Sequence, residues 1–139
     1  GKTKRNEAMF LESGKTYIYF TYGMYFCFNV VTNKKGIGEA VLIRALEPIE
    51  GIELMKKRRS VNDNKNLCNG PAKLVEAMGI KKEQNGSDLL NGKLRIEKGE
   101  NGKREYIGIG KRIGISKGID LYYRFFIKDN GFLSRKECS

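Results

Sequence analysis

The sequence predicts a single α+β domain with a mostly antiparallel β-sheet flanked by short helices. Residues 16–31 are almost entirely aromatic, β-branched or apolar, which favours two buried strands. Prolines at positions 48 and 71 favour the first turns of two short helices. The chain has 139 residues, enough for one domain, and we expect no second one.

Residues 1–12 are polar and basic, with Lys2, Lys4 and Arg5 clustered near the start. Ser13-Gly14 supplies a turn before the first strand. We therefore expect a flexible basic arm ahead of the sheet.

The strands of residues 16–31 are separated at Tyr22-Gly23, so that we expect a hairpin with an aromatic tip. Because side chains alternate between the two sides of a strand, Tyr17 and Tyr19 share one face. After the break, one face carries Tyr25, Cys27, Asn29 and Val31, and the other carries Met24, Phe26, Phe28 and Val30. An exposed apolar tip either packs under another loop or enters a base stack.

Asn29 is the one amide in this apolar strand. A buried amide without a partner costs about 1 to 3 kcal/mol. We therefore expect Asn29 either to hydrogen-bond a neighbouring backbone group, as a core asparagine does, or to face a ligand.

Residues 39–46 form the next predicted strand, with Leu42, Arg44 and Leu46 on one face. An arginine within an apolar strand is costly to bury unless it meets an anion. We expect Arg44 either to form a salt bridge with Glu47 or Glu53, or to contact a functional anion.

The first predicted helix begins at Pro48 and ends in the basic run 56–59. Its apolar stripe consists of Ile52, Leu54 and Met55. The basic run suits the helix dipole and is also a plausible phosphate-contact patch.

The second predicted helix begins at Gly70-Pro71 and ends at Gly79. Its N-terminal N–H groups, with Lys73 one turn in, could hold a DNA phosphate.

The last third predicts a loop over residues 80–92 and short strands over 93–97 and 121–127. Residues 106–115 carry glycines at positions 108, 110 and 114 among isoleucines. This spacing favours close strand packing over a phosphate cradle.

The formal charge is +11, from 27 basic and 16 acidic residues. Such an excess favours a polyanionic partner, although part of it can be solvated lysine surface. Cys27, Cys68 and Cys138 form no CxxC pair and the chain has no histidine, which argues against a zinc site and favours a reducing compartment. No apolar run reaches the about 18 residues of a membrane span, and we expect a soluble intracellular protein.

The sequence resembles the alkyladenine (3-methyladenine) DNA glycosylase family, single-domain enzymes that flip and remove alkylated or deaminated purines. The matching segments are Arg5-Asn6, Met9-Phe10, residues 17–29, 41–48, 68–74 and 112–115, and Arg124-Phe125. The resemblance implies a curved sheet like that of the formyltransferase C-terminal domain. It also implies a monofunctional hydrolase that needs no cofactor and no metal and acts as a monomer on duplex DNA with a damaged purine.

The resemblance also implies roles for individual residues. Tyr22 matches the intercalating wedge, with Met24 beside it. Tyr19 matches a wall of the stacking pocket and is assigned with Tyr17 to base binding, while Asn29 matches the residue that crowds the exocyclic amine of guanine. The remaining assignments are Arg44 near the attacking water and a phosphate, the Ile113 carbonyl as an acceptor for that water, and Arg59 and Lys73 on the DNA backbone.

The general base of the family belongs to a Glu-Thr-Glu-Ala-Tyr-like motif upstream of the first match, and this sequence contains no such motif. A stacking tyrosine and a pocket histidine of that region are also absent, and Tyr122 stands near the place of a usual proline. Glu39 and Glu47 are the nearest carboxylates in sequence, and neither matches the catalytic position. The chain starts at Gly1 and not at methionine, so we expect that sequence upstream is missing.

Two other functions stay open. A basic nucleic-acid-binding module without chemistry fits the missing glutamate, and a bifunctional lyase would need a lysine in the apolar pocket segments, where none occurs. The compartment follows the source: the nucleus in a eukaryote, the cytoplasm in a bacterium.

Overall fold

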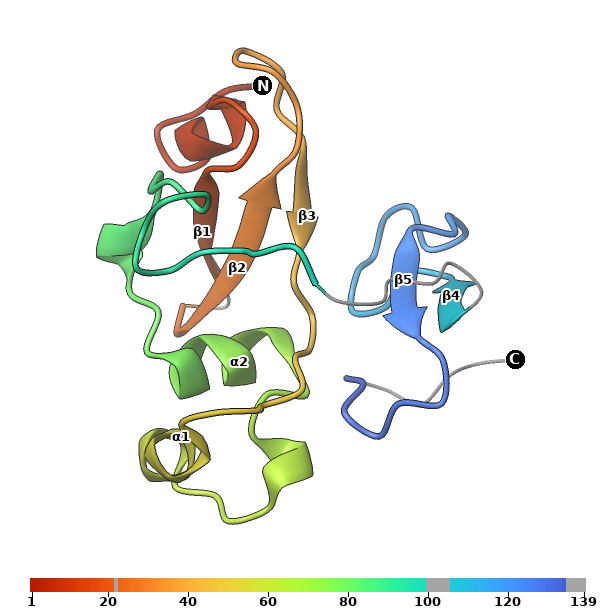
Figure 1. Ribbon diagram of the computed structural model, residues 1–139. Helices are drawn as coiled ribbons and strands as arrows, with labels where there is room; N and C mark the ends of the chain where they lie inside the picture. The colour runs from red at the N-terminus through yellow and green to blue at the C-terminus, as the bar shows by residue number, and fades with distance from the viewer. Residues whose placement is uncertain (22, 100–105, 135–139) are drawn as a thin grey trace.

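The centre of the fold is a three-stranded antiparallel sheet, seen in a computed structural model that describes residues 1–21, 23–99 and 106–134. The strands lie in the order β1 (Thr16–Thr21), β2 (Tyr25–Val31) and β3 (Ala40–Leu42). Helix α2 (Pro71–Met78) packs against β2, and α1 (Ile52–Arg59) packs against α2. A separate antiparallel pair, β4 (Ile107–Gly110) and β5 (Arg124–Ile127), lies beyond β3 (Figure 1). The predicted α+β class with antiparallel sheets is confirmed.

Three short 3-10 helices complete the described elements: η1 (Glu7–Phe10), η2 (Asn64–Asn66) and η3 (Lys82–Gln84). The first of them contradicts the predicted flexible arm, because Ala8 is buried beside Tyr17 and Val31. The Ala8 side chain is small but apolar, so its burial helps to stabilise the turn. Of the basic residues ahead of it, Arg5 contacts β1, through the Tyr19 ring and the Phe20 carbonyl.

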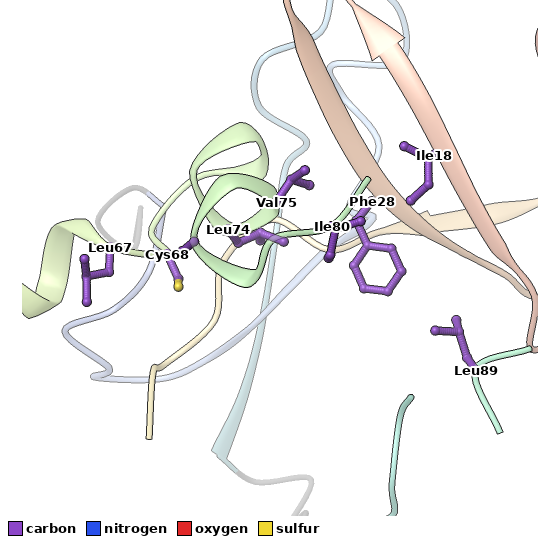
Figure 2. Close-up of a cluster of buried hydrophobic side chains, with 9 residues drawn as sticks. Ile18, Phe28, Leu67, Cys68, Leu74, Val75, Ile80 and Leu89 are labelled. Carbon is purple, nitrogen blue, oxygen red and sulfur yellow. The ribbon is translucent and has the colours of Figure 1, made fainter. Parts of the chain in front are cut away.

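The core lies on one face of the hairpin, as the alternation predicts. Ile18 of β1 and Phe28 of β2 point from the sheet toward α2, where Leu74 and Val75 meet them (Figure 2). The other members of this cluster are Leu67, Cys68, Ala77, Ile80 and Leu89. Full burial of each leucine contributes about 2 kcal/mol, so this cluster fixes the sheet on the helix.

Helix α2 begins and ends where its sequence signals predict. Pro71 occupies the first turn, where its missing N–H costs nothing, and Gly79 ends the helix in the left-handed conformation with φ 68°. The Gly79 N–H then donates to the Glu76 carbonyl. The helix N-terminus is thereby held at a defined place beside the sheet.

The predicted strand 39–46 is too long. Pairing with β2 stops at Leu42, after which only the Ile43 N–H donates to the Phe28 carbonyl at 3.0 Å. The chain then turns away, and the Leu46 N–H donates to the Cys68 carbonyl at 2.9 Å. Leu46 packs into the core cluster as a result, so its predicted position on the face of Arg44 is wrong.

Helix α1 starts later than predicted, at Ile52 and not at Pro48. Gly51 precedes it in the left-handed region, with φ 71°, which a continuous helix from residue 48 cannot contain. Ile52 and Met55 pack against the core, whereas Leu54 is 51% exposed and does not belong to the apolar stripe.

The C-terminal third holds fewer strand residues than predicted. Residues 93–97 form no strand, although the Ile96 N–H donates to the Leu89 carbonyl at 2.8 Å. The final strand begins at Arg124 and not at residue 121. The predicted close packing of the glycine-spaced segment is confirmed at Gly108, where a Cβ would lie 2.3 Å from the Phe126 ring.

Candidate functional site

A cavity of about 530 Å³ opens on the hairpin face opposite the core. The strand register explains why its lining residues meet, since Tyr17 pairs with Asn29, Tyr19 with Cys27, and Thr21 with Tyr25. All six therefore point to the same side of β1 and β2. The other lining residues come from three segments: Leu42, Arg44, Pro71, Ala72, Gly114 and Ile115.

Two tyrosines form an aromatic wall of this cavity. The rings of Tyr17 and Tyr19 lie edge to face, with centroids 6.0 Å apart and planes at 63°. Burial raises the pKa of the Tyr17 hydroxyl, the neighbouring Tyr19 raises it further, and Arg5 partly opposes the shift. Both rings present flat apolar surface with a polar edge, which suits a planar heterocycle.

Asn29 is held by its own hairpin and also faces the cavity. Its Nδ2 donates to the Tyr17 carbonyl at 3.1 Å and, more weakly, to the Cys27 carbonyl at 3.5 Å. These bonds use the amide nitrogen and fix the orientation of the carboxamide. The two alternatives left open for this side chain are thus compatible, because it is hydrogen-bonded and lines the cavity.

Arg44 brings a positive charge into the cavity wall. Arg44 lies two residues after Leu42, where β3 ends and the chain no longer pairs with β2. It lines the cavity from this position. A Cβ at Gly114, whose φ is 70°, would come within 3.4 Å of Arg44 Nη2, so the two segments are in close approach. Burial raises the pKa of the Cys27 thiol, and the nearby Arg44 cation partly lowers it.

The other end of the cavity is formed by the first residues of α2 and by the segment before residue 116. Pro71 and Ala72 belong to the first turn of α2, whose dipole adds partial positive charge. Gly114 and Ile115 line the cavity, while Ile113, predicted to offer its carbonyl, directly precedes them and is not itself a lining residue.

No carboxylate is among the described residues that line the cavity. Glu39 accepts a hydrogen bond from Asn33, and Glu47 accepts one from Asn130, both at exposed positions. Within the part of the chain that the structure describes, no three His, Cys, Asp or Glu side chains gather as metal ligands would. The described lining therefore combines aromatic and apolar side chains with the neutral polar groups of Thr21 and Asn29 and the cation of Arg44.

The predicted wedge residue falls in the sequence between β1 and β2. Tyr22 lies outside the described residues. Its neighbours are placed: Gly23 turns the chain with φ 69°, and the Met24 side chain is 67% exposed. Met24 therefore stands at the tip of the hairpin with most of its surface in solvent.

Arg59, which was predicted to contact the DNA backbone, has several partners within the chain. Its guanidinium donates to the carbonyls of Asn66 at 3.0 Å and Leu67 at 3.1 Å, and it lies 3.5 Å from the Glu76 carboxylate. Only 11% of the side chain is exposed. It thus joins α1, α2 and the loop between them.

Lys73 also has partners within the chain. Its Nζ donates to the amide oxygens of Asn66 at 2.9 Å and Asn69 at 3.1 Å, in a half-buried setting. A phosphate would have to share this ammonium group with two amides. The ammonium has three donor positions, and one is left for a further acceptor.

Sequence reasoning did not nominate several residues that the structure brings to the site. The alternation already placed Cys27 on the face of Asn29, and Thr21 continues the face of Tyr17 and Tyr19, so both could have been found. Pro71 and Ala72 carried only a helix-start signal. Arg5 stood in the basic cluster and in a matching segment, but neither signal pointed to Tyr19, whose ring centroid lies 4.6 Å from its Cζ.

No helix among the described residues combines the length and the apolar character that crossing a membrane requires.

Known proteins similar to this chain share one family. A family model described as methylpurine-DNA glycosylase matches residues 1–131. A protein of Carboxydothermus hydrogenoformans is 53% identical over 137 residues, which make up 98% of this chain and 72% of that protein. A protein of Francisella tularensis subsp. tularensis is 52% identical over 138 residues, with 97% and 72% covered, and one of Methanoculleus marisnigri is 44% identical over 139, with 98% and 72% covered. All three carry the name "Putative 3-methyladenine DNA glycosylase". The resemblance seen in the motifs is thereby confirmed, and the chain belongs to the methylpurine-DNA glycosylase family.

Proposed function

We propose that this chain serves as a DNA repair glycosylase that flips a damaged purine out of duplex DNA and hydrolyses its N-glycosidic bond. Its substrates are alkylated or deaminated purines such as 3-methyladenine, in keeping with the family and with the names of its relatives. The observation that carries the proposal is the single cavity lined together by Tyr19, Asn29 and Arg44.

The cavity has the size and lining that a flipped base requires. Its volume of about 530 Å³ falls within the roughly 300 to 1,000 Å³ that small-molecule sites occupy. Tyr17 and Tyr19 offer stacking surface, and the fixed carboxamide of Asn29 meets the edge of the base. A purine with an extra exocyclic amine, such as guanine, would be crowded at this edge.

The partner is duplex DNA, bound by a monomer. A net charge of +11 attracts the phosphate backbone without reading sequence. The hairpin tip of Tyr22, Gly23 and Met24 then serves as the wedge that fills the gap left by the flipped base. Met24, exposed at this tip, has the apolar side chain that such a wedge uses.

In the hydrolysis, water attacks C1′ of the flipped nucleotide, the C1′–N bond breaks, and the base leaves with a proton. Arg44 is placed to bind the phosphate of this nucleotide or to orient the water, beside the backbone of residues 113–115. The reaction also needs a group that accepts a proton from water. The described lining residues include no carboxylate. We therefore assign them binding and positioning, and not the role of proton acceptor.

The second candidate is a module that binds damaged DNA without cleaving it, since the described lining residues offer binding groups and no carboxylate. The two functions are separated by incubating the protein with duplexes that carry hypoxanthine or 1,N6-ethenoadenine. Time-dependent release of the free base, measured by chromatography, supports the glycosylase. Preferential binding of the lesion duplex without release supports the module.

The matched controls are an undamaged duplex and the Tyr19→Leu variant. Tyr19→Leu removes one stacking ring and should lower lesion binding and release together. Equal binding of damaged and undamaged duplexes by the unaltered chain, together with equal base release from both, would contradict both functions.

A further inference from the structure

Arg5 lies over the ring of Tyr19, one of the two tyrosines of the aromatic wall. Its Cζ is 4.6 Å from the centroid of the Tyr19 ring, and its Nη2 donates to the Phe20 carbonyl. Arg5 is exposed and is not among the residues that line the cavity, whereas Tyr19 is half-buried and lines it. The guanidinium therefore covers one face of a ring that also lines the cavity.

The segment that carries Arg5 is closed by local hydrogen bonds and is anchored to the sheet at Ala8. The Asn6 side chain accepts a hydrogen bond from the Thr3 N–H at 2.6 Å and donates to the Gly1 carbonyl at 3.2 Å. Two residues further on, Ala8 is only 4% exposed and packs beside Tyr17. The stacking of Arg5 on Tyr19 is thus a built contact and not a chance position of a long side chain.

A permanent cation on one side of a ring changes what the other side attracts. The attraction of an aromatic face for cations comes from its negative quadrupole, and Arg5 already engages that quadrupole. A positively charged base stacked on the same ring would also be repelled by Arg5 across the ring. A neutral base is not repelled by Arg5, and its stacking does not depend on the attraction of the ring for cations.

We propose that Arg5 is a positioning residue that holds Tyr19 in the cavity wall and shifts the preference of the pocket from cationic toward neutral purines. This inference rests on the proposed function, because it takes a flipped purine as the occupant of the cavity. It assigns a determinant of specificity to a side chain that touches no base.

The test compares equilibrium binding of two lesion duplexes, one with cationic N7-methylguanine and one with neutral 1,N6-ethenoadenine. Arg5→Gln removes the charge and keeps a polar side chain. Lys4→Gln is the matched control, because it removes one positive charge from an exposed neighbour in the same segment. Binding is measured at one fixed salt concentration, since charge loss weakens all DNA binding.

Arg5→Gln is expected to raise the ratio of N7-methylguanine affinity to ethenoadenine affinity by about 3- to 10-fold, the size of a partly exposed cation–π contact. Lys4→Gln is expected to weaken both duplexes equally. Arg5→Lys keeps the charge and should keep the ratio near that of the unaltered chain, while weakening both duplexes because a lysine cannot stack its planar group on Tyr19.

A double-mutant cycle with Tyr19→Leu tests whether the effect passes through the ring. Without the ring, Arg5→Gln should no longer move the ratio. An unmoved ratio in Arg5→Gln, or the same shift in the Tyr19→Leu background, would overturn the Arg5 inference alone. Equal binding of damaged and undamaged duplexes by the unaltered chain would overturn the proposed function and this inference with it.

Discussion

Replacing Arg59 by methionine tests whether this arginine stabilises the fold or contacts DNA. The variant keeps the apolar stem and removes the guanidinium, which donates to two backbone carbonyls at 3.0 and 3.1 Å. Hydrogen bonds from a charged donor contribute about 1.5 to 3 kcal/mol each. The Glu76 ion pair adds little, because the carboxylate side chain is 55% exposed.

We expect Arg59→Met to lower the free energy of unfolding by about 3 kcal/mol. For 139 residues, an unfolding entropy of about 0.29 kcal/mol per kelvin converts this loss into a fall in Tm of about 10 °C. Differential scanning calorimetry measures the fall. The control is Lys57→Met, an exposed position on the same helix, where the free energy should change by no more than about 0.5 kcal/mol.

The same variant also tests the alternative, a contact between Arg59 and a DNA phosphate, through the salt dependence of its DNA affinity. If Arg59 neutralised a phosphate, its loss would reduce the slope of log affinity against log salt by about 0.9. We expect the slope of Arg59→Met to match that of the unaltered chain at a temperature where both are folded. An unchanged Tm together with a reduced slope would refute the structural role.

The other predictions concern the cavity wall and its supports. Asn29→Ser should relax discrimination against guanine by about 10-fold or more, the usual effect of making room in a pocket, and single-turnover release of guanine against hypoxanthine checks this. Thr16→Val should lower the free energy of unfolding by about 2 to 3 kcal/mol, because its fully buried hydroxyl lies within hydrogen-bond distance of four groups of Gln84 and Ser87. Denaturant unfolding measures this loss, and a loss below about 0.5 kcal/mol would contradict the role of this hydroxyl. Burial raises the pKa of Cys27, and only the thiolate reacts with iodoacetamide, so we expect alkylation of Cys27 to need a higher pH than alkylation of free cysteine. Peptide mapping over a pH series measures this. Alkylation of Cys27 at a lower pH than free cysteine would mean that Arg44 outweighs burial.

Local patterns were sufficient for the hairpin and for part of the site. The period of two in residues 16–31 separates Tyr17, Tyr19 and Asn29 from Ile18 and Phe28, and the structure places the two groups on opposite faces. This works because strand alternation depends only on the backbone. The signals of Gly70-Pro71 and Gly79 predict α2 for the same reason.

Features set by distant contacts could not be predicted. The early end of β3 depends on the Leu46 N–H reaching the Cys68 carbonyl, a partner that no local spacing reveals. Arg59 shows the same limit, because a basic residue at a helix end has the same sequence signal whether it faces solvent or a neighbouring loop. The contact of Arg5 with Tyr19 joins residues on different elements, and only the fold brings them together.

The most direct test of the central claim is a crystal structure of this chain bound to a duplex that carries 1,N6-ethenoadenine. We expect the modified base outside the helix, stacked on Tyr19 with its edge at Asn29, and the hairpin tip in the gap it left. A bound duplex with the base still stacked in the helix and the cavity unfilled would contradict the account.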